Sequence, residues 1–295
     1  MDYKAFPFYQ RTNLDLLFSN LWEIFKRYFG WLFFYSFLLT IFSQAVATYV
    51  FKGELENLMN SLADPAAIGS YLKALVPYLL FIWIFISFEY LFLTSFVLGR
   101  YLEPEKSVMS ILGTMMRYHY PKYLFVVLIS YFIIVMGTTL GVFALIIGAL
   151  VAFVFLGVSL MPVTSVMLIE DTGVFATIGR SFRLVLQDFW NVMAYTLLFL
   201  LLYGVAATIL GLLAMAPAAG TFLRSILHPG SGATGTLSKM AMMDNPLYLI
   251  LDSLANALLL PFLVIFPILI YFHLKYLEDK KQEMQETTHN ESLTR

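Results

Sequence analysis

The chain contains no cysteine among its 295 residues. This absence excludes disulfide bonds, thiol nucleophiles and thiolate-bound metals, but it does not identify the compartment. Histidine is scarce as well, and no two of the 4 histidines have the short helical spacing of a zinc-binding pair. The sequence also lacks a Gly-x-Ser-x-Gly motif, a phosphate-binding loop and a paired-carboxylate motif. We therefore expect no metal site, no cofactor and no enzymatic activity.

Charged residues are also few in this sequence. Charged residues make up 13% of the chain and hydrophobic residues 60%, and the mean hydropathy is +0.79. A soluble protein of this length could not bury so much apolar surface, so the composition indicates a polytopic membrane protein. The net charge of −1 gives no reason to expect nucleic acid as a partner.

Long apolar runs predict the number of membrane spans. An α-helix crosses ~30 Å of hydrocarbon with ~20 residues, at ~1.5 Å per residue. The runs that meet this requirement are 30–51, 75–99, 122–138, 140–169, 189–214 and 247–273. The third and fourth runs are expected to meet in a tight turn at Gly137–Gly141. The predicted fold class is therefore an all-α, polytopic helical membrane bundle of six transmembrane helices.

The distribution of basic residues predicts the orientation of these spans. Only Lys52, Lys73, Arg224 and Lys239 lie on one side of the membrane, and all other Lys and Arg residues lie on the opposite side. Because cytoplasmic segments carry the excess of Lys and Arg, both termini are expected in the cytoplasm. An even number of spans requires the same arrangement.

One pattern occurs three times: a short amphipathic segment, a cluster of aromatic residues, and then a long apolar run. The copies are Asn20–Trp31, Ile111–Lys122 and Ser181–Asn191. Repetition of this kind predicts architecture before any local motif does. It indicates a three-fold helix–hairpin repeat inside a single transmembrane domain, residues 1–277, followed by a polar cytoplasmic tail, residues 278–295. The predicted repeats are about 12–99, 105–170 and 172–277.

The amphipathic segments are expected to be three helices on the cytoplasmic side of the membrane. The second should start at Ser107 and end at Pro121. In the third, Val174, Phe175, Ile178, Phe182 and Val185 should share one face, opposite Arg180 and Arg183. Such helices either hold the bundle at the membrane surface or bind lipid or a partner. The candidate contacts to lipid headgroups are Lys26, Arg27, Arg117, Lys122, Arg180 and Arg183.

Three polar residues within the spans are candidates for a substrate or ion site. Glu89 lies deep in the second apolar run, where a charged carboxylate costs ~2.5–3.5 kcal/mol. We expect it to be buried in the bundle and hydrogen-bonded, either as a link between helices or as a proton or ligand site. Asp252 and Asn256 are four residues apart on the last span and therefore share a helix face. They form either a polar patch wetted from the outer side or part of the same site.

The segment Leu160–Trp190 carries a recognisable motif. A membrane span carries Pro162 and Glu170 near its end and is followed by Gly173. An amphipathic helix that contains Arg180 and Ser181 comes next and ends in Phe189-Trp190. This motif, together with the run Ile270–Glu278, resembles the membrane-domain family found with some glycerophosphoryl diester phosphodiesterases, and related polytopic bacterial membrane families of unknown function. The resemblance implies a helical bundle in the bacterial inner membrane. It implies no phosphodiesterase activity, which belongs to a separate soluble domain that we do not expect in this chain.

Three functions remain open from the sequence. The first is a non-catalytic inner-membrane protein that is an accessory or scaffold subunit of an envelope complex, or that handles lipid. Its expected partners are membrane lipids, with a membrane-protein partner or a second copy of the chain as further candidates. The second is a transporter or channel subunit with a polar site near Glu89 and Asp252. The third is a membrane-embedded enzyme, for which the sequence offers few polar groups.

Overall fold

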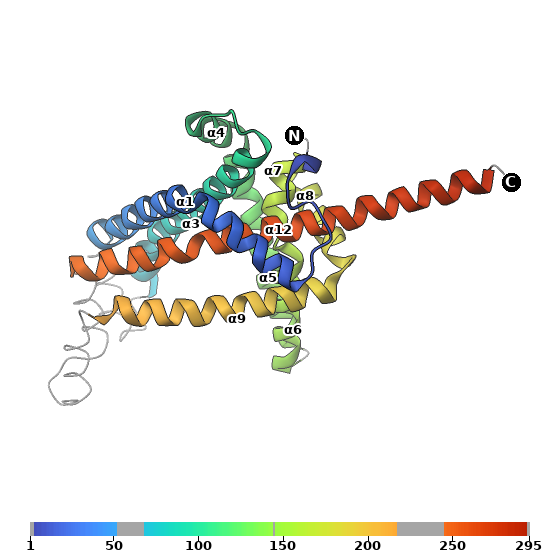
Figure 1. Ribbon diagram of the computed structural model, residues 1–295. Coiled ribbons are helices and arrows are strands. Elements are labelled where there is room, and N and C mark those ends of the chain that lie inside the picture. The colour runs from blue at the N-terminus through green and yellow to red at the C-terminus, as the bar shows by residue number, and fades with distance from the viewer. Residues whose placement is uncertain (1–2, 52–67, 144, 217–244, 294–295) are drawn as a thin grey trace. The chain divides into compact units, whose positions relative to one another are not determined.

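The computed structural model describes residues 3–51, 68–143, 145–216 and 245–293, and every regular element in these ranges is helical. The elements, shown in Figure 1, are η1 (Tyr3–Ala5), α1 (Leu14–Val50), α3 (Ile68–Leu102), α4 (Val108–Thr114), the π-helical segment η3 (Met115–His119), α5 (Tyr120–Val142), α6 (Leu145–Leu160), α7 (Val163–Glu170), α8 (Val174–Leu186), α9 (Phe189–Ala214) and α12 (Pro246–Leu293).

Six helical segments are long and apolar enough to cross a membrane. They are Leu14–Val50, Leu75–Leu102, Val108–Val142, Ile146–Glu170, Phe189–Ala214 and Pro246–Thr287. The predicted all-α class and the presence of six helices able to cross a membrane are therefore confirmed for the described residues. The three-fold repeat and the side of the membrane on which each end lies stay predictions.

The chain forms two compact units, each built from separated segments of the sequence. Unit 1 comprises Met1–Tyr28, Tyr90–Leu200 and Phe262–Arg295, and unit 2 comprises Phe29–Glu89 and Leu201–Pro261. The predicted polar tail that starts at residue 278 continues the last helix, since α12 extends to Leu293, and the predicted domain boundary stays a prediction.

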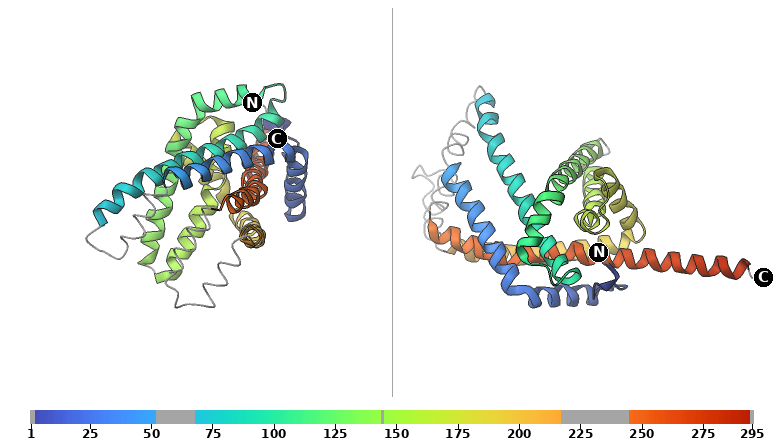
Figure 2. Two further views of the ribbon diagram at one scale, coloured as in Figure 1. Left: turned by 90° about the vertical axis from the view of Figure 1, so that its left-hand side faces the viewer. Right: turned by 90° about the horizontal axis from the view of Figure 1, so that it is seen from above.

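The helices α5 and α6 of unit 1 form a hairpin with extensive contact, and both views in Figure 2 show the two helices side by side. The expected turn at Gly137–Gly141 is wrong. Both glycines lie inside α5, and the chain turns at Phe143 instead. A Cβ atom at Gly141 would lie 2.6 Å from the carbonyl oxygen of Gly148. These glycines therefore allow the helices to approach closely rather than to reverse direction.

The second amphipathic segment is continuous with the membrane span that follows it. Ser107 caps α4 as expected, and its Oγ accepts a hydrogen bond from the backbone N–H of Ser110. The expectation that Pro121 ends the helix is wrong, because Pro121 lies in the first turn of α5. Proline is tolerated there because the first helical N–H groups have no partner within the helix. The π-helical segment joins α4 to α5.

The third amphipathic segment forms a separate helix, α8, that packs against α5, α6 and α7. Asp171 ends α7 in the left-handed conformation, with a φ angle of 44°. Of the five apolar residues expected to share a face, Ile178 and Val185 are buried within the protein, whereas Phe175 is 78% exposed. The fully or largely buried residues are Thr177, Ile178, Ser181, Leu184 and Val185. Two small hydroxyl residues are buried because the helix packs closely, and the Ser181 Oγ donates a 2.7 Å hydrogen bond to the Ser159 carbonyl.

Unit 2 contains the remaining parts of α1 and α3, which contact each other through aromatic side chains. The rings of Phe42 and Phe85 lie 5.6 Å apart, and Phe51 lies 5.6 Å from Phe81. The first amphipathic segment is not a separate helix, because α1 runs without a break from Leu14 to Val50. Its start is as expected, since the Asn13 side chain accepts a hydrogen bond from the N–H of Leu16.

Candidate functional site

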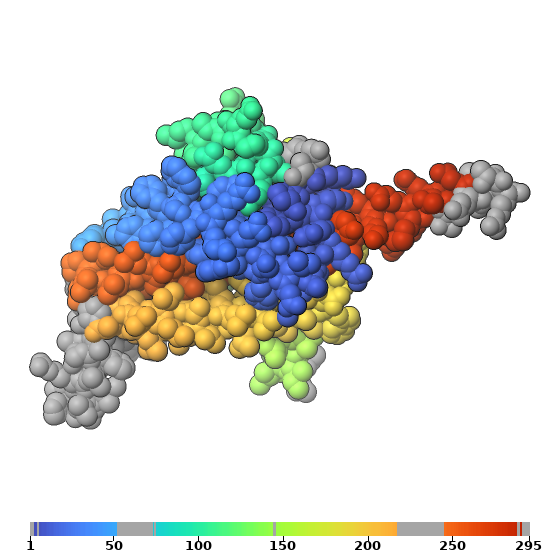
Figure 3. Space-filling view, viewed as in Figure 1, coloured from blue at the N-terminus to red at the C-terminus, as the bar shows by residue number. Residues whose placement is uncertain are grey.

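The N-terminal segment of unit 1 lies against the C-terminal part of α12, as Figure 3 shows in dark blue and red. The Phe6 ring stacks on Phe272 with 3.9 Å between centroids, and Phe6 is 2% exposed. The Tyr9 hydroxyl donates a 2.6 Å hydrogen bond to the carboxylate of Asp279. Burial and this hydrogen bond raise the pKa of Tyr9 above its ordinary value. The segment Tyr3–Asn13 thereby forms one wall of the site described below.

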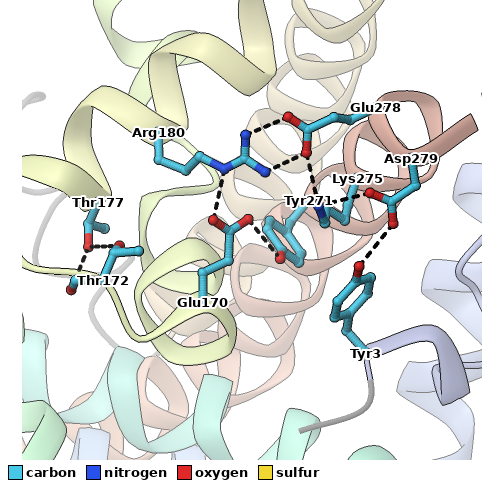
Figure 4. A network of polar contacts seen from close by, with 9 residues as sticks. All are labelled: Tyr3, Glu170, Thr172, Thr177, Arg180, Tyr271, Lys275, Glu278 and Asp279. Atoms are coloured by element: carbon cyan, nitrogen blue, oxygen red, sulfur yellow. Dashed lines mark hydrogen bonds and ion pairs between the residues drawn. The ribbon is translucent and has the colours of Figure 1, made fainter. Parts of the chain in front are cut away.

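A cluster of charged side chains joins α7, α8 and α12 (Figure 4). We call it the Arg180 cluster, and its members are Tyr3, Glu170, Arg180, Tyr271, Lys275, Glu278 and Asp279. The Arg180 Nε donates to Glu170 at 2.8 Å, and both Nη atoms donate to the carboxylate of Glu278. Tyr271 donates a 3.2 Å hydrogen bond to the second oxygen of Glu170.

Charge is well compensated within the Arg180 cluster. Lys275 lies 2.9 Å from both Glu278 and Asp279, and Tyr3 donates a 3.0 Å hydrogen bond to Asp279. The hydrogen bonds from Arg180 to Glu278 are the main cause that raises the pKa of the guanidinium. Because each cation already has carboxylate partners, the cluster is a link between helices rather than an open ligand site.

A polar pocket opens in unit 1 where the start of α1, the connection from α8 to α9, and α12 meet. Its volume is about 740 Å³, within the ~300–1,000 Å³ typical of small-molecule sites. We call it the His273 pocket. It is lined by Arg11, Thr12, Asn13, Leu16, Gln187, Asp188, Asn191, Tyr195, His273, Leu277 and Lys281.

His273 is fixed at the base of this pocket by two protein groups, and it is 2% exposed. The backbone N–H of Thr12 donates a 2.9 Å hydrogen bond to Nδ1. Because a backbone N–H can only donate, Nδ1 carries no proton and the imidazole proton lies on Nε2. Nε2 in turn lies 3.2 Å from the carboxylate of Asp188. Both ring nitrogens are therefore occupied by protein partners.

Asp188 is held from a second side. The Asn191 side-chain amide donates a 2.6 Å hydrogen bond to its other carboxylate oxygen. The two cations that line the pocket, Arg11 and Lys281, are exposed, and within the described part of the chain neither forms an ion pair. The pocket therefore offers two cations that form no ion pair, beside the carboxylate of Asp188.

The candidate headgroup residues are not brought together into one collar. Lys122 pairs with Asp171 at 3.0 Å, and Arg180 is held within its cluster. Lys26, Arg27 and Arg117 are exposed and lie over aromatic rings, namely Trp22, Tyr28 and Tyr118 respectively. Arg183 is exposed. Their predicted contact with lipid stays a prediction, although Arg180 has its guanidinium already committed to carboxylates.

Glu89 is buried, with 7% exposure, and accepts a 3.1 Å hydrogen bond from the Thr40 hydroxyl. The expectation of a buried, hydrogen-bonded carboxyl group is confirmed, and its function stays untested.

Asp252 and Asn256 interact as expected from their spacing, with a 3.0 Å hydrogen bond between their side chains. The sequence did not single out Gln44, which donates to Asp252 and accepts a 2.8 Å hydrogen bond from Ser253.

The residues that sequence reasoning missed are those of the His273 pocket and the carboxylates of the Arg180 cluster. One signal was present: the motif quoted for the family resemblance contains Glu170, Arg180 and Glu278, which meet in space. No comparable signal marked Arg11, Asp188 or Lys281, because their proximity depends on how α1, α9 and α12 pack. Among the described residues, no group of three or more His, Asp or Glu side chains could hold a metal ion.

Comparisons with known proteins identify no relative. No family model, no curated protein and no solved structure matches the chain.

Proposed function

We propose that this polytopic membrane protein is a non-catalytic lipid-handling protein of the bacterial inner membrane, and that the His273 pocket binds the phosphate group of an anionic lipid at the cytoplasmic surface. The observation that supports this most directly is the presence of Arg11 and Lys281 in one polar pocket without carboxylate partners. A guanidinium binds two phosphate oxygens at once, and an ammonium adds a mobile donor.

The composition of the pocket supports a headgroup rather than an apolar ligand. Beside the two cations, the amides of Asn13, Gln187 and Asn191 and the hydroxyl of Tyr195 line the cavity. Such groups donate hydrogen bonds to phosphate and glycerol oxygens. Leu16 and Leu277 line the same cavity and provide apolar surface for the first carbons of an acyl chain.

The state of His273 favours binding over catalysis. A general base needs an unshared ring nitrogen within reach of a substrate proton. In this pocket Nδ1 accepts from Thr12 and Nε2 faces Asp188, so neither nitrogen is available. The imidazole instead fixes the N-terminal segment and Asp188 as walls of the pocket.

The location follows from the predicted topology. Arg11 precedes the first span, Asp188 lies between the fourth and fifth, and Lys281 lies toward the end of the last helix. The positive-inside distribution assigns all three positions to the cytoplasmic side. There an anionic leaflet attracts each exposed cation with about 1 kcal/mol.

The test compares two double variants reconstituted in nanodiscs that contain a defined fraction of phosphatidylglycerol. Arg11→Gln with Lys281→Gln removes the two pocket cations. Arg100→Gln with Lys280→Gln removes one Arg and one Lys that lie outside the pocket and are not candidate headgroup contacts, so the change in net charge is identical. Native mass spectrometry counts the anionic lipid that each variant retains.

We expect the pocket variant to lose binding by roughly thirtyfold, equivalent to about 2 kcal/mol for two cations, and the control to retain it. Equal losses in both variants would mean that only the overall charge matters, which would contradict the proposal. A second arm adds inorganic phosphate or glycerol 3-phosphate as competitors. Displacement of lipid at low millimolar concentrations would assign the pocket to a free phosphate compound rather than to a lipid.

A further inference from the structure

A ridge of polar residues runs along the part of α1 that belongs to unit 2. Ser36, Thr40, Gln44 and Thr48 follow one another at intervals of four residues and therefore lie on one face, over ~18 Å of helix. Ser36 is 0% exposed, and Thr40 and Thr48 are each 9% exposed. A buried polar ridge inside a helix this apolar is costly unless it faces polar partners or a ligand.

Two carboxyl groups meet this ridge on adjacent turns. Thr40 donates to Glu89 of α3, and Gln44 donates to Asp252 of α12. Ser36 lies one turn before Thr40 on the same ridge. Its buried hydroxyl has no hydrogen-bond partner among the described residues and could therefore bind a further polar group. The ridge thus holds Glu89 and Asp252 about one helical turn apart, ~6 Å along the α1 axis.

The surroundings of Glu89 supply no counter-charge. It forms no ion pair with any described residue, and the Thr40 hydroxyl is its hydrogen-bond donor. The other titratable side chains described in unit 2, besides Asp252, are Tyr35, Tyr49, Lys73, Tyr78, Tyr203 and Tyr248. None of these forms an ion pair or hydrogen bond with Glu89, and Lys73 is exposed. The electrostatic contact of Tyr248 is with Asp252.

We propose that Glu89 is a proton-binding site within the membrane-spanning part of unit 2, which takes up and releases a proton along the polar ridge of α1. A carboxyl group in hydrocarbon, without a cation, is neutral at rest and charges only when its environment is wetted or polar groups approach it. The Thr40 hydroxyl is such a group, since it stabilises the ionised form by donating to it. This site lies in unit 2 and is independent of the His273 pocket proposed above.

Chemical labelling tests the proposal without knowledge of a transported substrate. Dicyclohexylcarbodiimide reacts with protonated carboxyl groups in apolar surroundings: the acid proton moves to a reagent nitrogen, the carboxyl oxygen bonds to the central carbon, and rearrangement yields a stable N-acylurea. The intact protein in nanodiscs is labelled at a series of values from about pH 5 to about pH 9. Peptide mass spectrometry then locates the adduct.

We expect Glu89 to be labelled at low pH and progressively protected as the pH rises. The internal control is Glu103, which pairs with Lys106 at 2.8 Å and lies outside the candidate spans. It should remain unlabelled, because the reagent reacts with carboxyl groups in apolar surroundings and Glu103 lies outside the apolar spans. Thr40→Val should raise the pH of half-maximal labelling at Glu89 by about one unit, because the ionised form loses its donor.

Two results would overturn the proposal. Labelling of Glu89 that stays constant over the whole pH range would show a proton that never exchanges, and Glu89 would then be a fixed link between α1 and α3. The absence of labelling at Glu89 in the folded protein, with labelling restored in sodium dodecyl sulfate, would show that the site is closed to proton and reagent alike. Glu89→Gln preserves an acceptor for Thr40 and verifies that the adduct arises at this residue.

Discussion

Arg180 of α8 and Glu278 of α12 form a bidentate ion pair, although 98 residues separate them in the sequence. The same guanidinium also donates to Glu170 at the end of α7, so one side chain joins three helices of unit 1. The side chains of Arg180 and Glu278 are 11% and 13% exposed. An ion pair with so little solvent contact is costly to break from one side only, because the remaining charges stay buried.

Arg180→Gln should therefore destabilise unit 1, since Glu170 and Glu278 would lose their shared cation. We expect a loss of about 2 kcal/mol, below the ~3–5 kcal/mol of a fully buried pair because some solvent reaches both groups. The melting temperature in mild detergent measures this effect. Arg183→Gln, which removes an exposed Arg one turn away, is the control and should leave the melting temperature unchanged. Equal effects of the two substitutions would show that the ion pair contributes nothing.

His273→Leu should destabilise the N-terminal segment by about 2 kcal/mol, because the N–H of Thr12 loses its acceptor and Asp188 loses one of its two donors. His273→Asn is a graded control, since its amide oxygen can replace Nδ1 and accept from Thr12. We expect the loss of stability in His273→Asn to be about half of the loss in His273→Leu. Limited proteolysis within residues 3–13 reports the release of the segment. Resistance to proteolysis in His273→Leu would mean that the aromatic stacking of Phe6 on Phe272 holds the segment alone.

Gly141→Ala should separate α5 from α6, because the new Cβ would lie 2.6 Å from the Gly148 carbonyl oxygen and 2.8 Å from the Cα of Ala149. Backbone atoms cannot yield as a flexible side chain does, so we expect a loss of about 1–3 kcal/mol. Gly157→Ala on α6 is the matched control. Its Cβ would meet nothing within 4 Å, and it should be neutral or stabilising. The melting temperatures of both variants in thermal unfolding test this prediction. Identical melting temperatures would contradict the close contact between α5 and α6.

Cysteine labelling should place the α5–α6 turn outside the cytoplasm and the C-terminal part of α12 inside it. The chain has no native cysteine, so single cysteines introduced at Phe143, which is 86% exposed, and at Glu283 report without background. A membrane-impermeant maleimide applied to spheroplasts should label Phe143→Cys and spare Glu283→Cys. The reverse pattern would invert the topology. The loop of residues 215–246 is also predicted to lie outside, and its residues 217–244 fall beyond the described part of the chain.

The sequence by itself determined the features that depend on a few neighbouring residues. Hydropathy over about 20 residues predicted all six spans, and the side-chain caps at Asn13 and Ser107 marked two helix starts correctly. The same local reasoning placed the turn at Gly137–Gly141, ahead of its position at Phe143, because a glycine that permits helix contact and one that permits a turn look alike in sequence.

Only the tertiary structure decided which polar groups meet. Thr12 and His273 are 261 residues apart, and the residues that line their pocket come from three separated segments. The expected exposed position of Arg180 was derived from the periodicity of its own helix, which cannot register the carboxylates of Glu170 and Glu278 arriving from α7 and α12. Membrane insertion is driven by the apolar surface of each helix separately, whereas the partner of a buried charge depends on how those helices pack.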